Sequence, residues 1–114
     1  MNTRLEGTAG ENVAEEYLKN LGYKILERNF TAPHGEIDIV AKEGKYIVFV
    51  EVKRRKTSRF GLPQEAVTVQ KQRVIAQCAA YWLAKNKLYG APVRFDVVGI
   101  LDDDVTLIRD AFRP

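Results

Sequence analysis

Cysteine and histidine are nearly absent from this sequence: its 114 residues contain one of each, Cys78 and His34. A single cysteine excludes an internal disulfide and a zinc site built from several cysteines, and it is typical of proteins in a reducing compartment. A single histidine excludes a metal site with two histidine ligands. If the chain is an enzyme, we therefore expect its chemistry to come from carboxylates, lysines and a hard metal ion.

Long apolar runs are absent as well. The longest run, Tyr46–Val50, has five residues, far fewer than the roughly 20 that a membrane-spanning helix needs. No apolar segment follows the basic Arg4 within the first twenty residues, so we expect no secretory signal and no membrane partner. A hydrophobic fraction of 46% and a charged fraction of 29% are typical of a folded globular chain. We predict one cytoplasmic domain over residues 1–114.

The positive charges are concentrated in one part of the chain. Eighteen Lys and Arg residues outnumber fifteen Asp and Glu residues, for a net charge of +3. Five of the seven residues between Lys53 and Arg59 are basic, and clustered cations of this kind suit a phosphate backbone. A solvated loop or a localisation tract is the alternative. The residues predicted to bind nucleic acid are Arg54, Arg55, Lys56, Arg59, Lys71 and Arg73.

Hydrophobic periodicity and turn residues predict an α/β protein with the order α-β-β-β-α-β-β. Turns are expected at residues 31–35, 43–45 and 102–104, and a loop at 54–63. A central mixed sheet flanked by helices accommodates this order. The expected helices cover residues 8–21 and a stretch from between 63 and 68 to about 86, and the expected strands cover 23–30, 36–42, 46–53, 93–101 and 105–109.

Two acids on neighbouring strands form the first candidate site. Glu51 interrupts the otherwise apolar or aromatic stretch 46–52, and a carboxylate buried there needs a partner or a metal. The hairpin turn at 43–45 is expected to place Asp38 opposite a residue near Val50. A one-residue shift of this register would bring Asp38 and Glu51 together. Alternating side chains put Glu36, Asp38 and Val40 on one face, and Ile37, Ile39 and Ala41 on the other.

Paired carboxylates followed by a lysine suit Mg2+ or Mn2+, which prefer oxygen ligands. Lys53 is positioned to orient a water molecule or to steady a phosphate. The alternative is an acid–lysine surface pair on an edge strand. The other such spacing, Glu43 and Lys45, lies in the expected hairpin turn, and we interpret it as a solvated pair. Glu11 shares a helical stripe with Ala14 and Leu18. It is therefore either a third carboxylate for the metal or an acid that stabilises the helix N-terminus.

Further along the chain, Cys78 is expected in the helix core with Val74, Ile75 and Trp82. Lys71 lies on the same stripe, where it either contacts phosphate or extends out of the core edge. His34 is interpreted as a turn residue, and Asp96 is left without a role.

The spacing resembles a known signature. Ile37-Asp38, twelve intervening residues and then Glu51-Val52-Lys53 are similar to the P-D…(D/E)-x-K pattern of the restriction-endonuclease-like nuclease superfamily, with Ile37 in place of the proline. A helical Glu11 before the two strands is similar to the arrangement in archaeal Holliday junction resolvases. The resemblance implies that Asp38, Glu51 and the Val52 carbonyl hold the metal, that Lys53 is the catalytic lysine, and that Glu11 is the helical acid.

A closer resemblance covers residues 7 to 100. The segments Gly35 to Ala41, Val48 to Arg55, Gly61 to Thr68 and Arg94 to Val98 are similar to the YraN-like bacterial family, as are residues around Glu11 and Gly22. The family is predicted to be endonuclease-like and is otherwise uncharacterised. The resemblance implies a restriction-endonuclease-like fold and a Mg2+- or Mn2+-dependent endonuclease acting on DNA, with branched DNA as one candidate and a homodimer in that case. The alternatives are a non-catalytic nucleic-acid-binding accessory protein and a purely structural ion-pair network.

Overall fold

The computed structural model describes the backbone of residues 3–114 and the side chains from Ala9 onward. The first residues of the domain predicted over 1–114 therefore lie outside the described part. Within residues 3–114, no helix has an apolar stretch long enough to cross a membrane.

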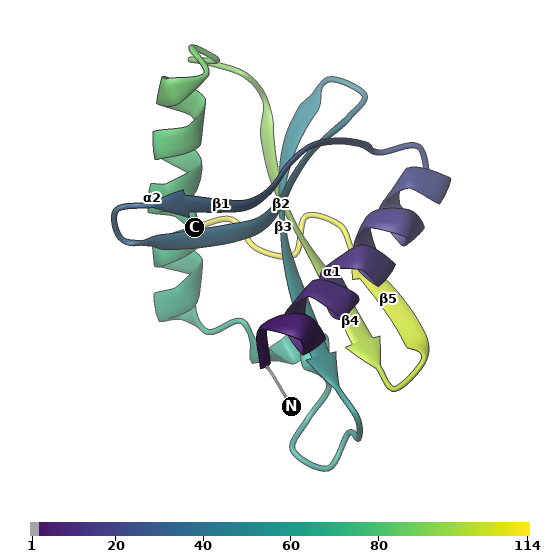
Figure 1. The fold of residues 1–114 in the computed structure, drawn as a ribbon. Coiled ribbons are helices and arrows are strands. Elements are labelled where there is room, and N and C mark those ends of the chain that lie inside the picture. Colours follow the sequence, from purple (N-terminus) through teal and green to yellow (C-terminus); the bar gives the residue numbers. More distant parts are fainter. Residues whose placement is uncertain (1–2) are drawn as a thin grey trace.

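Two helices and five strands follow one another in the order that the sequence predicts (Figure 1). The sheet has the strand order β1-β2-β3-β4-β5, in which β3 and β4 run parallel and every other neighbouring pair is antiparallel. The mixed α/β architecture is thus confirmed. The elements are α1 Thr3–Asn20, β1 Lys24–Ala32, β2 Gly35–Glu43, β3 Tyr46–Arg55, the short 3-10 helix η1 Pro63–Ala66, α2 Val69–Lys85, β4 Val93–Leu101 and β5 Asp104–Ile108.

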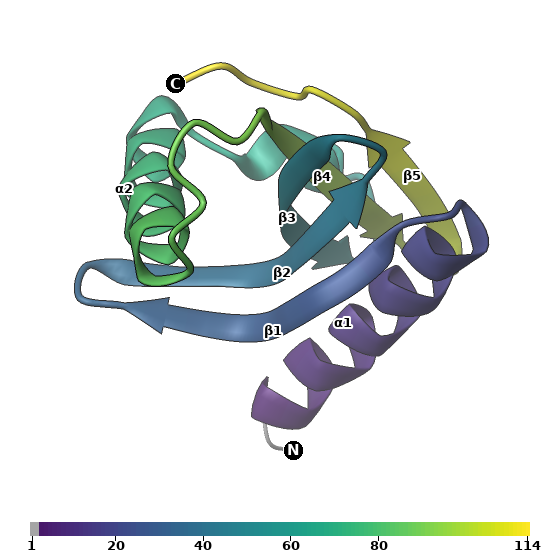
Figure 2. The same ribbon diagram turned by 90° about the horizontal axis from the view of Figure 1, so that it is seen from above.

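Each face of the sheet is covered by one helix, and Figure 2 shows α1 and α2 on opposite sides of the strands. Ala14 and Leu18 of α1 are fully buried against one face, in a cluster with residues of β2, β3 and β4. Cys78 and Trp82 of α2 are buried against the other face, where Trp82 meets Phe49 edge to face at 5.8 Å between ring centroids. Each large side chain buried in this way contributes about 1.5–3 kcal/mol. The expected core position of Cys78 is confirmed, and burial raises the pKa of its thiol.

Local signals fix the helix ends that border the candidate site. Thr68 caps α2, since its side-chain oxygen accepts a hydrogen bond from the Lys71 N–H at 3.1 Å. Lys71 is therefore held in the first turn of the helix. Gly22, with φ +96°, follows α1 and allows the chain to turn into β1.

Several predicted boundaries differ from the structure by a few residues. The turn predicted at 31–35 contains only Pro33 and His34, because Ala32 and Gly35 still pair. The β2–β3 turn contains only Gly44 and Lys45, because Glu43 pairs with Tyr46. The loop predicted over residues 54–63 begins two residues later than expected. Pairing with β4 continues to Arg55, so Arg54 and Arg55 lie on β3.

The prediction of one face for Ile37, Ile39 and Ala41 was also wrong. Ile39 and Ala41 pack in the cluster with α1, whereas Ile37 packs with Val40 in the cluster with α2. The pairing of β2 with β3 extends only to Ile39, and Ile37 pairs with Phe30 of β1 alone. Because two-stranded ribbons twist more strongly than wider sheets, the face that β2 presents changes at this point.

Candidate active site

The candidate site lies where β2 and β3 separate. Their backbone pairing ends at Ile39 opposite Val50, one residue away from the register expected from the sequence. Continued by one residue, this register sets Asp38 against Glu51. The Val52 N–H donates a hydrogen bond to Asp38 Oδ2 at 2.8 Å, so a carboxylate takes the place of a backbone partner here. The structure therefore brings Asp38 and Glu51 together, and we refer to these two residues as the acid pair.

Glu51 is the more deeply buried member of the acid pair. It shares a face of β3 with Ile47 and Phe49, beneath α2, and only 3% of its surface is exposed. Among the described residues, its buried Oε1 has no hydrogen-bond partner. The pKa of Glu51 is raised from 4.5 to about 8, first by burial and then by the charge of Asp38 and a hydrogen bond with the Asp38 carboxyl group. The positive charges of Lys71 and Lys53 lower this pKa and offset part of the rise. A buried carboxylate with an unpartnered oxygen is unfavourable unless it binds a proton or a cation.

Asp38 shares this environment. Burial raises its pKa, and the charges of Glu11 and Glu36 raise it further, while the Val52 N–H and the charge of Lys53 lower it. Glu36 itself is exposed. Neighbouring carboxyl groups that both resist ionisation are arranged to share a proton or to bind a cation together.

Two lysines border the acid pair from different elements. Lys53 follows Glu51 by two residues on β3, and Lys71 comes from the first turn of α2; both are partly buried. Neither ammonium group forms a direct ion pair within the described residues. Each lowers the pKa of Glu51, so their positive charge acts on the acid pair without neutralising it by contact.

Glu11 approaches the acid pair but is already engaged. It lies on the α1 stripe with the buried Ala14 and Leu18, as the sequence predicts. Its side chain is 12% exposed, and its carboxylate pairs with Arg28 of β1 at 3.3 Å. Its charge still raises the pKa of Asp38. The structure thus places Glu11 near Asp38 and gives it a cationic partner.

The donor set at the site consists of oxygens. In an extended strand the N–H and C=O of one residue point to the same side, so the Val52 carbonyl faces the gap between β2 and β3 into which its N–H donates. Across the side chains that the structure describes, no group of three or more His, Cys, Asp or Glu residues is arranged around one metal position. The oxygen donors that the acid pair and β3 provide here are two carboxylates and this carbonyl.

The predicted nucleic-acid-binding residues fall into two groups. Arg54 and Arg55 end β3, and Lys56 and Arg59 are exposed in the loop that follows. The Arg54 side chain runs beside Gly10 of α1, where an added Cβ would lie 3.6 Å from its Cδ. The second group lies on α2, where Lys71 faces the acid pair and the exposed Arg73 does not.

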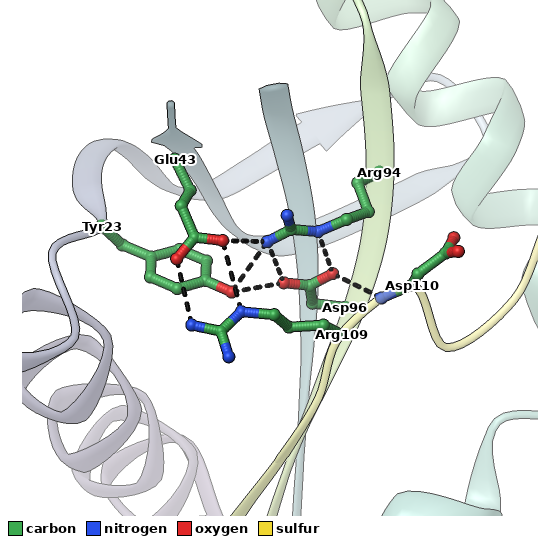
Figure 3. A network of polar contacts seen from close by, with 6 residues as sticks. All are labelled: Tyr23, Glu43, Arg94, Asp96, Arg109 and Asp110. Carbon is green, nitrogen blue, oxygen red and sulfur yellow. Dashed lines mark hydrogen bonds and ion pairs between the residues drawn. The ribbon is translucent and has the colours of Figure 1, made fainter. Parts of the chain in front are cut away.

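Sequence reasoning missed a second polar cluster, on the α1 face of the sheet (Figure 3). Asp96 is fully buried. Its carboxylate accepts hydrogen bonds from the Tyr23 hydroxyl at 2.7 Å, from two Arg94 nitrogens at 2.9 Å and from the Asp110 N–H at 2.9 Å. The signal was visible, since Asp96 is the only acid within the apolar stretch of β4. Asp96 pairs with Val50 of β3 and points to the same face as Val50. Because neighbouring strand residues point to opposite faces, Glu51 and this cluster lie on opposite faces of the sheet.

The interpretation of Glu43 and Lys45 as a solvated pair was wrong. Glu43 joins the same cluster and pairs with Arg94 at 2.6 Å and with Arg109 at 3.0 Å. Lys45 instead lies over the ring of Tyr46, with its ammonium 5.4 Å from the centroid. The cause is the turn, which leaves Glu43 on β2 and only Gly44 and Lys45 outside the strands.

Fold and site together define an α/β protein with a buried acid pair at the point where two strands diverge. Residues 10–100 match the model of the uncharacterised protein family UPF0102, and the chain belongs to this family, the YraN-like family that its sequence resembles. A UPF0102 protein of Lachnoclostridium phytofermentans is 50% identical over 113 residues, which cover 98% of this chain and 96% of that protein. A UPF0102 protein of Caldicellulosiruptor saccharolyticus is 47% identical over 118 residues, which cover 98% and 100% of the two chains.

Proposed function

We propose that this protein is a metal-dependent nuclease that hydrolyses DNA phosphodiester bonds, with branched or otherwise structured DNA as its preferred substrate. One observation carries the proposal: the buried Oε1 of Glu51 lacks a partner although Glu51 adjoins a second carboxyl group. A protein gains no stability from such an arrangement. It is instead typical of a site that binds a cation or transfers a proton.

The residues present fit a hard divalent cation. Asp38, Glu51 and the Val52 carbonyl would hold Mg2+ or Mn2+, because these ions prefer oxygen ligands and keep several waters when bound by one or two carboxylates. When bound, the ion would lower the pKa of a coordinated water and neutralise charge on a phosphate. The unpartnered carboxylate oxygen supports this assignment.

Lys53 and Lys71 would act on the attacking water and on phosphates rather than hold the metal. Lys53 lies on the same strand face as Glu51, and the positive charges of Lys53 and Lys71 act on the acid pair. At such a site Lys53 would orient the attacking water or stabilise negative charge that develops on the phosphate. Lys71, at the start of α2, would contact a neighbouring phosphate of the same strand.

DNA is the proposed substrate because cations surround the end of β3. The positive charge continues from the lysines beside the acid pair into the loop through Arg55, Lys56 and Arg59. In this proposal these three residues contact phosphates rather than base edges. Cutting a four-way junction at two symmetry-related positions requires two active sites, so we propose a homodimer for that activity. A DNA substrate also implies a cytoplasmic protein, in agreement with its single cysteine.

A second candidate function is a nucleic-acid-binding accessory protein without catalysis. The engagement of Glu11 by Arg28 favours it, because this ion pair leaves two carboxylates at the site. The basic residues would then act alone, and the acid pair would have no role in catalysis.

The test is incubation of the purified protein with Mg2+, and separately with Mn2+, against linear, single-stranded, flapped and four-way-junction DNA. Glu51→Gln is the inactive variant, and Glu16→Gln, an exposed position on α1, is the matched control. Metal-dependent cutting by the wild type and by Glu16→Gln, lost in Glu51→Gln, supports the nuclease. Equal, salt-sensitive DNA binding by all three proteins without cutting supports the accessory function. No binding to DNA at low salt would contradict both.

A further inference from the structure

The loop between β3 and η1, residues 56–62, presents an aromatic side chain to solvent. Phe60 is 80% exposed, and Figure 1 shows this loop extending beyond the end of β3 and beyond the turn between β4 and β5. We call residues 56–62 the basic loop. Single exposed apolar side chains are common on protein surfaces; Phe60 is distinguished by the turn that holds it and by the cations beside it.

The turn that carries Phe60 is fixed by hydrogen bonds. The Gly61 N–H donates to the Ser58 carbonyl at 3.0 Å, and Gly61 has a φ of +103° that other residues rarely adopt. Arg59 and Phe60 therefore occupy the apex of a closed turn. The loop is also anchored after the turn, where the Leu62 N–H donates to the Glu65 carboxylate at 3.2 Å and Pro63 is buried.

The charged side chains of the basic loop itself have one sign. No acid occurs between Val52 and Gln64, and the Arg59 guanidinium lies over the Phe60 ring, 5.7 Å from its centroid. An aromatic face combined with arginine is the combination on which unpaired bases stack while the neighbouring phosphates meet cations. A membrane or an apolar protein partner would require a wider apolar surface than Phe60 and Leu62, which is 38% exposed, offer together.

The position of the basic loop favours a path for a DNA strand from this loop toward the acid pair. The turn between β4 and β5 contains Asp102 and Asp103, one residue fewer than predicted, because Asp104 pairs with Leu101 as the first residue of β5. The Asp102 N–H donates to the Arg55 carbonyl at 2.8 Å. Negative charge thus borders the basic loop on the β4–β5 side and repels phosphates there. The acid pair lies on the other side, toward β2. The four residue steps of β3 from Glu51 to Arg55 span roughly 13 Å, so the basic loop begins about this far from Glu51.

We propose that Phe60 stacks on an unpaired base of DNA while a phosphate of the same strand lies at the acid pair. The inference rests on the proposed function and specifies its substrate class: DNA with unpaired bases, such as a flap or an opened junction. Fully paired duplex offers no base face to this ring without unstacking, so it binds through phosphate contacts alone.

The experiment measures binding and needs no cleavage. Flap, single-stranded and duplex DNA of equal length carry 2-aminopurine at successive unpaired or paired positions and are titrated with protein in EDTA. Phe60→Ala removes the ring, and Phe60→Trp restores a stacking surface. Tyr89→Ala is the matched control, because Tyr89 is 75% exposed beyond the end of α2, away from the basic loop. Circular dichroism and thermal unfolding verify that each variant is folded.

The proposal predicts that Phe60→Ala weakens binding of flap and single-stranded DNA about tenfold, abolishes the fluorescence change of 2-aminopurine and leaves duplex binding unchanged. Phe60→Trp restores both signals, and Tyr89→Ala behaves as wild type. Equal loss for paired and unpaired DNA, no loss at all, or no DNA binding by the wild type overturns it. If stacking depends on Phe60 while the wild type cuts no DNA with either metal, the nuclease proposal fails and the stacking site stands.

Discussion

Replacing Glu51 with glutamine should stabilise the metal-free protein at alkaline pH. The glutamine is nearly isosteric with the glutamate and remains neutral beside Asp38. In the wild type the pKa of Glu51 is raised from 4.5 to about 8, so the folded state retains a proton that the unfolded chain releases above pH 4.5. Stability therefore falls as pH rises between these two values, and the substitution removes this dependence.

The size of the effect follows from the same pKa values. One pKa unit corresponds to about 1.4 kcal/mol, so a change from 4.5 to about 8 makes ionised Glu51 roughly 5 kcal/mol costlier to bury than to expose. At pH 9 we expect Glu51→Gln to exceed the wild type by about 3–5 kcal/mol in the free energy of unfolding. At pH 5 the two proteins should agree within about 1 kcal/mol, because both side chains are then largely neutral.

The assay is urea denaturation in EDTA at several pH values between 5 and 9, followed by circular dichroism. Glu16→Gln controls for the loss of one negative charge at an exposed site on α1, and it should follow the wild type throughout. A difference between wild type and Glu51→Gln that does not change with pH would refute the reasoning. Lower stability of the variant at pH 9 would refute it as well.

Three further predictions follow from the same structure. Mg2+ or Mn2+ binding should tighten by up to about tenfold for each pH unit up to pH 8, because Glu51 must lose its proton; calorimetry at pH 6, 7 and 8 measures this, and pH-independent binding would contradict it. Asp96→Ala should cost about 3–5 kcal/mol in urea denaturation, because it removes the buried carboxylate to which Arg94, the Tyr23 hydroxyl and the Asp110 N–H donate; a cost below 1 kcal/mol would show that the cluster is dispensable. Lys56→Gln should reduce the slope of log binding constant against log salt by about 1, and an unchanged slope would exclude a phosphate contact at Lys56.

Most of the fold could be predicted from periodicity. The pattern of β4 predicted its bounds, Val93–Leu101, in full, because an apolar run between turn residues leaves few alternatives. The bounds of β1 and β2 were less certain, since their ladder continues through Ala32 and Gly35 and leaves a turn of two residues. Sequence patterns report side-chain burial and contain little information about how far a backbone ladder continues into a turn.

The candidate site was predictable in its residues and only partly in its geometry. Glu51 was identified because a charge within an apolar strand needs a partner, and its burial follows that logic. The register that sets Asp38 beside Glu51 depends on whether the turn has two or three residues, which composition does not decide. Arg28 lies 17 positions from its partner Glu11, and Tyr23 lies 73 positions from Asp96; such pairs emerge only when the strands are assembled.

The most direct test of the account is whether the acid pair binds a divalent cation. Electron paramagnetic resonance of Mn2+ titrated into the metal-free protein at pH 8 counts the bound ions and measures their affinity. We predict one ion per chain in the wild type and in Glu16→Gln, with at least tenfold weaker binding in Asp38→Asn and in Glu51→Gln. Equal binding by all four proteins, or none by the wild type, would contradict the central claim.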